Sequence, residues 1–334
     1  MLFARRIFPE GGKSIDNAHR AIADRLKIRV FSSFCLFEHL QTAILRDVQL
    51  DHTHVEEVLI FAVNDHDTDN SEGGDPQQYC ISIERPSLTL DRVVAGMLKN
   101  DGYKRDPDLR KRYSGKVCAV LRMVAKSLKH LHSQGVVHGD LCMVNCGKFD
   151  ETWKIMGTLG LQCIGQRFNP ARWHESFPPE AINEVDDEQG STICDSDDAP
   201  VGFKSNLVAE ASIDIWAFGK LAYEMLLGDP LLDFDASKKP SEDKVTLLEV
   251  MEWDESRMKD VFHSLLDAGI PESGADLITS CLFFLPDQRP ASMDEVLENP
   301  FWKEMRRGKE RSRRPKRSED SVYTETSRME KIEI

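Results

Sequence analysis

The sequence lacks any apolar run long enough to form a membrane-spanning helix. Its longest apolar runs are short, such as VLIFAV at residues 58–63, whereas a helical span needs about 20 apolar residues. The N-terminal stretch MLFARRIFPEGG also lacks the apolar core of a secretory leader. We therefore expect an intracellular protein of the cytoplasm, or of the nucleus, that makes no membrane contact.

Regularly spaced cysteines are also missing. The eight cysteines follow no pattern, so a disulfide framework is excluded and reduced thiols are expected. Cys142 and Cys146 form an isolated C-x3-C without a second pair. This spacing favours a buried structural role for both residues over a zinc site.

Positive charge is scarce outside one segment near the C-terminus. Residues 305–317 hold eight Lys and Arg and one Glu, a net charge of +7, within a chain whose total is −14. The remainder therefore carries −21, which does not suit a nucleic-acid groove. For the basic tail, contact with an import receptor or an acidic partner and a merely solvated surface both remain open.

Apolar periodicity predicts an α+β protein with two unequal lobes, a small mixed region followed by a larger helical one. Strands are predicted at 57–63 and 78–84, with a polar loop at 64–77 between them. Residues 184–198 are acidic and hold few apolar residues, which is typical of a surface loop. The predicted helices are 14–27, 34–48, 116–132, 214–228, 247–267 and 273–284.

An aspartate and an asparagine lie five positions apart in HGDLCMVN, residues 138–145, directly after a predicted long helix. A predicted strand pair, NCGKF and WKIMG, follows. In phosphoryl transfer, a carboxylate can take the proton of the attacking hydroxyl and an amide oxygen can hold a metal ion. The same two residue types are also typical of a surface Asx turn.

This motif resembles the catalytic loop of protein kinases, and three later segments match that family in the same order. FPPE, ending at Glu180, is similar to the end of the activation segment. DIWAFG, beginning at Asp214, is similar to the start of the central buried helix, and Arg289 in PDQRP matches the ion-pair partner of Glu180. The resemblance implies a truncated smaller lobe at 1–86, a larger lobe at 87–303 and a basic tail at 304–334.

The resemblance also implies roles for individual residues. Asp140 would be the catalytic base and Asn145 the ligand of one metal ion, with ATP and Mg²⁺ as cofactors of an active enzyme. Asp214 would brace the backbone of the catalytic loop, and His138 would be a packing residue. Glu84 lies in the stretch CISIERP, which corresponds to the hinge that contacts adenine.

The sequence lacks the carboxylate that binds the metal ion in protein kinases. In the family it opens a D-F-G motif, which falls on Gly157 when counted from the second strand and on Thr158 when counted from Asn145. We prefer Thr158, and neither position restores an acid. A neutral hydroxyl is a poor ligand for Mg²⁺, while Asp150 and Glu151 are expected in a hairpin turn that points away.

The phosphate-binding parts of the smaller lobe are also incomplete. No glycine-rich loop precedes FARRIF, where Arg6 would replace the family's lysine or would simply face solvent. Its partner acid would be Asp24 or Glu38. Within the catalytic loop, Gly139 replaces the arginine that receives an activating phosphate, and later Gly147 weakens the floor of an adenine pocket.

Three functions are compatible with this pattern. Losing one electrostatic group from a preorganised site costs about 10²–10³ in rate, so several losses predict a pseudokinase that serves as a binding or regulatory module for other proteins. An active Ser/Thr protein kinase would keep Asp140 and Asn145. A small-molecule phosphotransferase is suggested by Gly139 alone, since HGDL also occurs in that class.

Overall fold

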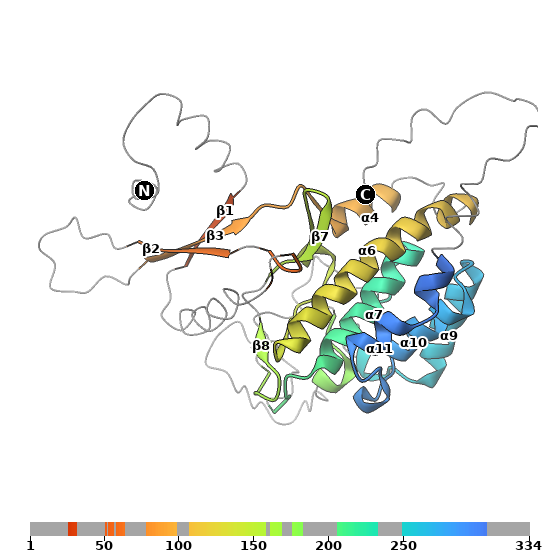
Figure 1. Cartoon of the computed structure of the whole chain (residues 1–334). Helices are drawn as coiled ribbons and strands as arrows, with labels where there is room; N and C mark the ends of the chain where they lie inside the picture. Colours follow the sequence, from red (N-terminus) through yellow and green to blue (C-terminus); the bar gives the residue numbers. More distant parts are fainter. Residues whose placement is uncertain are drawn as a thin grey trace, which may run out of the picture.

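The computed structural model shows a mixed α and β protein with a helical C-terminal part and several small sheets (Figure 1). For residues 26–31, 58–63, 78–84, 98 and 107–112 the description covers the backbone alone. The described residues are 26–31, 51, 53–56, 58–63, 78–98, 107–157, 161–168, 176–182, 206–232 and 249–305.

Two long helices form the centre of the helical part. Helix α6 spans Pro107–Ser133 and helix α7 spans Ala211–Leu227. α7 is apolar on almost every side and is accordingly buried almost throughout, with Trp216 and Phe218 fully enclosed. Its end is fixed by Gly228 in the left-handed conformation. The surrounding helices are α4 (Leu90–Leu98), α9 (Glu255–Asp267), α10 (Glu272–Cys281) and α11 (Met293–Glu298).

The strands of the described residues form three small antiparallel sheets (Figure 1). The largest has the order β1-β3-β2, with β1 at Leu26–Phe31, β2 at Val58–Val63 and β3 at Gln78–Glu84. The second has the order β4-β6-β7, with β4 at Leu88–Thr89, β6 at Cys146–Phe149 and β7 at Thr152–Ile155. The third pairs β5 (Val136–Val137) with β8 (Gln162–Cys163).

The residues just before β2 are attached to the end of β7. Val55 forms a parallel bridge with Ile155. The Glu56 N–H donates to the Ile155 carbonyl at 3.0 Å, and the Ile155 N–H donates to the His54 carbonyl at 3.1 Å. This short pairing brings a segment from the first third of the chain to the turn that follows β7.

Most predicted elements are confirmed, and two are corrected. The predicted helix 14–27 is wrong at its end, because Leu26 and Lys27 begin strand β1; its earlier residues lie outside the described part. The predicted helix 247–267 is divided, because Asp254 accepts a hydrogen bond from the Arg257 N–H and caps a new helix there. The predicted helix 34–48, both predicted loops and the basic tail beyond residue 305 fall outside the described residues.

Helix α6 begins earlier than predicted. Its first residue is Pro107, a residue favoured at the first helical position because it has no N–H to leave unpaired. Across the described ranges, no helix combines the length and apolar character needed to cross a bilayer. Cys142 and Cys146 are buried free thiols, as expected, and burial raises the pKa of the Cys146 thiol.

Candidate functional site

Asp214 binds the backbone of the loop 138–145 through its two carboxylate oxygens. Oδ2 accepts the backbone N–H of His138 at 2.7 Å, and Oδ1 accepts that of Gly139 at 2.8 Å. His132 at the end of α6 lies 2.9 Å from Oδ2. Burial alone would raise the pKa of this fully enclosed carboxyl, but His132, His138 and the Gly139 N–H outweigh it, and the pKa lies below 3.8.

His138 links the loop to the residue after β7. Its Nε2 lies 2.7 Å from the Met156 carbonyl and its Nδ1 lies 3.2 Å from the Asp140 N–H. A carbonyl can only accept and an N–H can only donate, so Nε2 carries the proton and Nδ1 is the acceptor. His138 is fully buried, and both of its ring nitrogens are hydrogen-bonded.

Asp140 and Asn145 are brought together at the mouth of the loop. The Asn145 Nδ2 donates to the Asp140 carbonyl at 2.7 Å and to its Oδ2 at 2.9 Å. A 3-10 turn, Met143–Asn145, makes this approach possible. Asn145 also accepts from the Met156 N–H through its backbone carbonyl, at 2.7 Å. The pair is therefore more than an isolated Asx turn, because it is tied to the turn after β7.

The turn after β7 is contacted by a carboxylate from a distant segment, Glu56, which the sequence pattern did not indicate. The Gly157 N–H donates to Oε1 of Glu56 at 2.6 Å, across 101 positions of the chain. Glu56 is only 2% exposed. Gly157 is left-handed, with a φ of 82°, and an added Cβ would lie 3.1 Å from Cγ of Asn145. Glu56, Gly157 and Asn145 are therefore neighbours around one backbone turn.

Gly147 in β6 faces a filled space. A Cβ added there would come within 2.6 Å of the Met156 Sδ and 2.8 Å of the Pro86 Cβ. The volume above the glycine is thus occupied by residues from the end of β7 and from the connection between β3 and β4. A side chain at position 147 would therefore clash with these neighbours.

The ion pair expected between Glu180 and Arg289 is present. The two guanidinium NH groups each bind one carboxylate oxygen at 2.7 Å. Arg289 also donates to the carbonyls of Phe283 and Ser212, at 2.7 and 3.0 Å, and its charge lies 5.0 Å from the centre of the Trp216 ring. This bidentate, enclosed arrangement connects the segment before the acidic loop to α7 and to the end of α10.

The remaining predicted site residues cannot be compared in the same way. Arg6 and Thr158 lie outside the described residues, as do Asp24 and Glu38. Glu84 ends strand β3 opposite Leu26, where the chain passes from the first sheet into the helical part. Asp150 and Glu151 occupy the hairpin turn between β6 and β7, as predicted.

Thr158, the position expected to replace the family's metal ligand, lies outside the described residues. Among the residues that the structure describes, no three His, Cys, Asp or Glu side chains are grouped as metal ligands. Proteins commonly hold Mg²⁺ through one or two carboxylates together with substrate phosphates. Asn145 donates to Asp140 through its Nδ2, so its Oδ1 is the atom that would bind a metal ion, while Oε1 of Glu56 accepts from the Gly157 N–H. No protein-family model matches the chain.

Proposed function

We propose that this chain is a protein-kinase-like module, with a smaller lobe up to residue 86 and a larger one at 87–303, that binds or regulates other proteins and transfers phosphate poorly. The observation that carries the proposal is the contrast within the site. Asp140 and Asn145 are held in a fixed loop by Asp214, yet Gly157 stands in the adjoining turn and Thr158 follows it.

The proposal is supported by the protein-kinase features of the helical part. The bidentate pair of Glu180 and Arg289 and the buried aspartate at the start of α7 both match what the motif resemblance implies. It is also supported by the packing of Met156 and Pro86 over Gly147, which takes up space that an adenine ring would need beside that strand.

Glu56 favours a second candidate function, an active protein kinase. Its carboxylate lies beside the turn where the family places its metal ligand. In such an enzyme Glu56 would supply the negative charge that position 158 lacks. Two measurements separate the candidates: thermal unfolding with ATP, with and without Mg²⁺, and transfer of radiolabelled phosphate to the chain itself and to a generic protein substrate.

For a binding module we expect no stabilisation that depends on Mg²⁺, and phosphate transfer at the level of the Asp140→Ala variant. The matched pair Glu56→Gln and Glu252→Gln serves as the control, because Glu252 is exposed and outside the site. Phosphate transfer that Asp140→Ala and Glu56→Gln both abolish, while Glu252→Gln leaves it intact, would overturn the proposal in favour of the active enzyme.

A further inference from the structure

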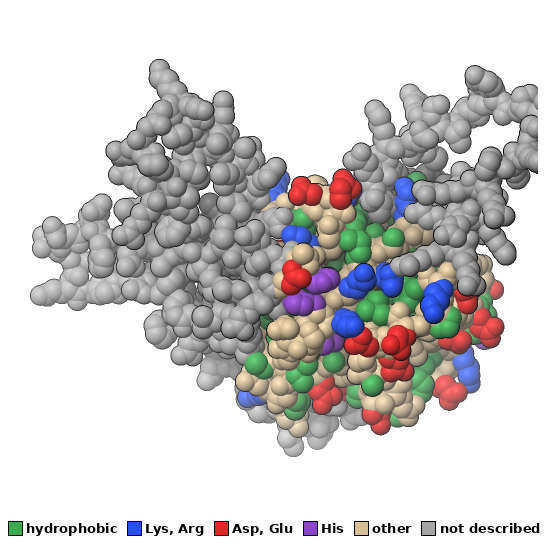
Figure 2. Space-filling model, in the orientation of Figure 1, with side chains coloured by type: hydrophobic (Ala, Val, Ile, Leu, Met, Phe, Trp, Pro, Cys, Tyr) green, Lys and Arg blue, Asp and Glu red, His purple; other side chains and the backbone are tan. Residues whose placement is uncertain are grey.

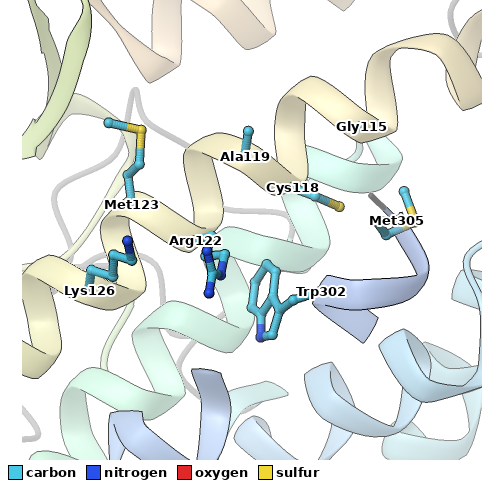
Figure 3. A pocket seen from close by; sticks show the side chains of 8 residues that line it. All are labelled: Gly115, Cys118, Ala119, Arg122, Met123, Lys126, Trp302 and Met305. Carbon is cyan, nitrogen blue, oxygen red and sulfur yellow. The ribbon is translucent and has the colours of Figure 1, made fainter. Parts of the chain in front are cut away.

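A groove runs between helix α6 and the segment 297–305. It consists of two adjoining hollows of about 330 and 470 Å³. Arg122 and Trp302 line both hollows, so the two form one continuous depression. Figure 3 shows Cys118 and Met305 at one end, Lys126 at the other, and Arg122 with Trp302 between them.

The groove combines an apolar floor with basic side chains. Trp302 is fixed by a hydrogen bond from its Nε1 to the Val296 carbonyl at 2.7 Å, so the ring is a rigid part of the floor. Burial raises the pKa of the Cys118 thiol to about 12, which keeps it neutral. The apolar lining residues are Cys118, Ala119, Met123, Leu297, Trp302 and Met305.

Three cations border this floor: Arg122, Lys126 and Lys303. Glu298 is the acidic residue of the lining, so the groove carries an excess of positive charge. Figure 2 shows basic side chains beside apolar surface on the face formed by α6 and α11. Such a groove suits an acidic segment that has aromatic or aliphatic anchors.

The C-terminal residues 318–334 combine acidic side chains with large apolar ones. Met305 lines one end of the groove. The basic stretch 306–317 comes next, and residues 318–334, SEDSVYTETSRMEKIEI, then hold five acidic and two basic residues. They also contain Val322, Tyr323 and three further large apolar residues. We propose that residues 318–334 dock in the groove between α6 and Trp302, with Val322 and Tyr323 as the apolar anchors.

The connection is long enough for this docking. Residues 306–317 can span about 40 Å when fully extended, at roughly 3.3–3.6 Å per residue. A short flexible connection also gives the tethered segment an effective concentration in the millimolar range. A segment with only weak intrinsic affinity would therefore occupy the groove for much of the time, and it would compete there with any acidic peptide from another protein.

The test uses the full chain with a photoreactive benzoylphenylalanine at position 323, written Tyr323→benzoylphenylalanine. After irradiation, the crosslinked peptides are identified by mass spectrometry. We expect the main intramolecular crosslinks within 115–126 and 297–305. Mixing chains labelled with ¹⁴N and ¹⁵N distinguishes links within one chain from links between two copies.

The control compares two exposed lysines of α6. Lys126→Glu places an acid in the groove, whereas Lys116→Glu makes the same change outside the lining. Because exposed charge pairs contribute about 0.2–1 kcal/mol each, we expect Lys126→Glu to lower the crosslink yield about two- to five-fold. Lys116→Glu should leave it unchanged.

Three results would overturn the proposal. Crosslinks that map to other surfaces would show that the segment lies elsewhere. Links found only between differently labelled chains would identify a second copy as the occupant. A yield that falls equally in Lys126→Glu and Lys116→Glu would show that net charge, and not this groove, controls the contact.

Discussion

The loop 138–145 and the turn at Met156 and Gly157 lie side by side, but they are held in different ways. The loop is held by hydrogen bonds from its backbone N–H groups to Asp214 in the buried helix α7. The turn is bonded to His138 and Asn145 of the loop through Met156, and its Gly157 N–H donates to a buried carboxylate, that of Glu56, from a distant segment. The loop keeps both polar residues that phosphoryl transfer would use, whereas the turn has none of its own.

The difference separates a carboxylate that the fold itself needs from one that would serve only a bound ligand. Asp214 satisfies backbone N–H groups that are buried whether or not a ligand is present, so removing it destabilises the protein itself. A metal-binding carboxylate interacts mainly when metal and nucleotide are bound. A chain without such a carboxylate is therefore expected to keep its fold.

The largest expected loss of unfolding free energy follows from removing Asp214, which holds the loop. Asp214→Ala removes the acceptor of two backbone N–H groups and the partner of His132. Breaking a buried charged network in this way costs about 3–5 kcal/mol of unfolding free energy. Urea unfolding measures it, with the exposed Asp260→Ala on α9 as the control. Equal losses in the two variants would show that Asp214 is not the brace.

The contribution of Asp214 should also depend on pH. Its pKa is lower in the folded protein than the ordinary 3.8, so its stabilising effect is present above the pKa of the unfolded chain and is lost as the pH falls through the folded pKa. The stability difference between the wild type and Asp214→Ala should therefore narrow below about pH 4. A difference that stays constant from pH 7 to pH 3 would contradict this.

A smaller loss of unfolding free energy is expected at the turn, where Gly157 can be compared with Gly165, a glycine of similar backbone conformation elsewhere. Gly157 and Gly165 have φ angles of 82° and 84°, but only Gly157 has a side chain, that of Asn145, within 4 Å of an added Cβ. Substitution by alanine strains both backbones, at a cost of about 1–2 kcal/mol. Gly157→Ala should lose roughly 1 kcal/mol more than Gly165→Ala in urea unfolding, because Asn145 must move. Equal losses would mean that Asn145 is not held against the turn.

The smallest expected change in free energy is that of the hydrogen bond between Glu56 and the Gly157 N–H. Glu56→Gln keeps the shape and an acceptor oxygen but removes the charge, which should weaken the hydrogen bond to Gly157 by about 0.5–1.5 kcal/mol. Hydrogen exchange of the Gly157 amide should accelerate accordingly, while the exposed Glu252→Gln leaves it unchanged. An unchanged exchange rate in Glu56→Gln would show that the charge of Glu56 does not fix the turn.

Sequence patterns predicted the local structure better than the contacts between distant segments. The apolar spacing of α6 and the buried character of α7 could be predicted from the residues themselves. The long-range pairing of Glu180 with Arg289 was predicted only from the resemblance to protein kinases. Strand β1 was missed because its first residues continue a helical spacing. Glu56 was missed because its role depends on the pairing of Val55 with Ile155, and an acid before an apolar strand is no signal by itself.

We propose that the loop 138–145 stands beside a turn that cannot hold a metal–nucleotide complex. Calorimetric titration of Mg²⁺-ATP into the wild type and Thr158→Asp tests it most directly. We predict no Mg²⁺-dependent binding to the wild type and measurable binding once the carboxylate is restored. Binding of Mg²⁺-ATP to the wild type as tight as to Thr158→Asp would contradict the claim.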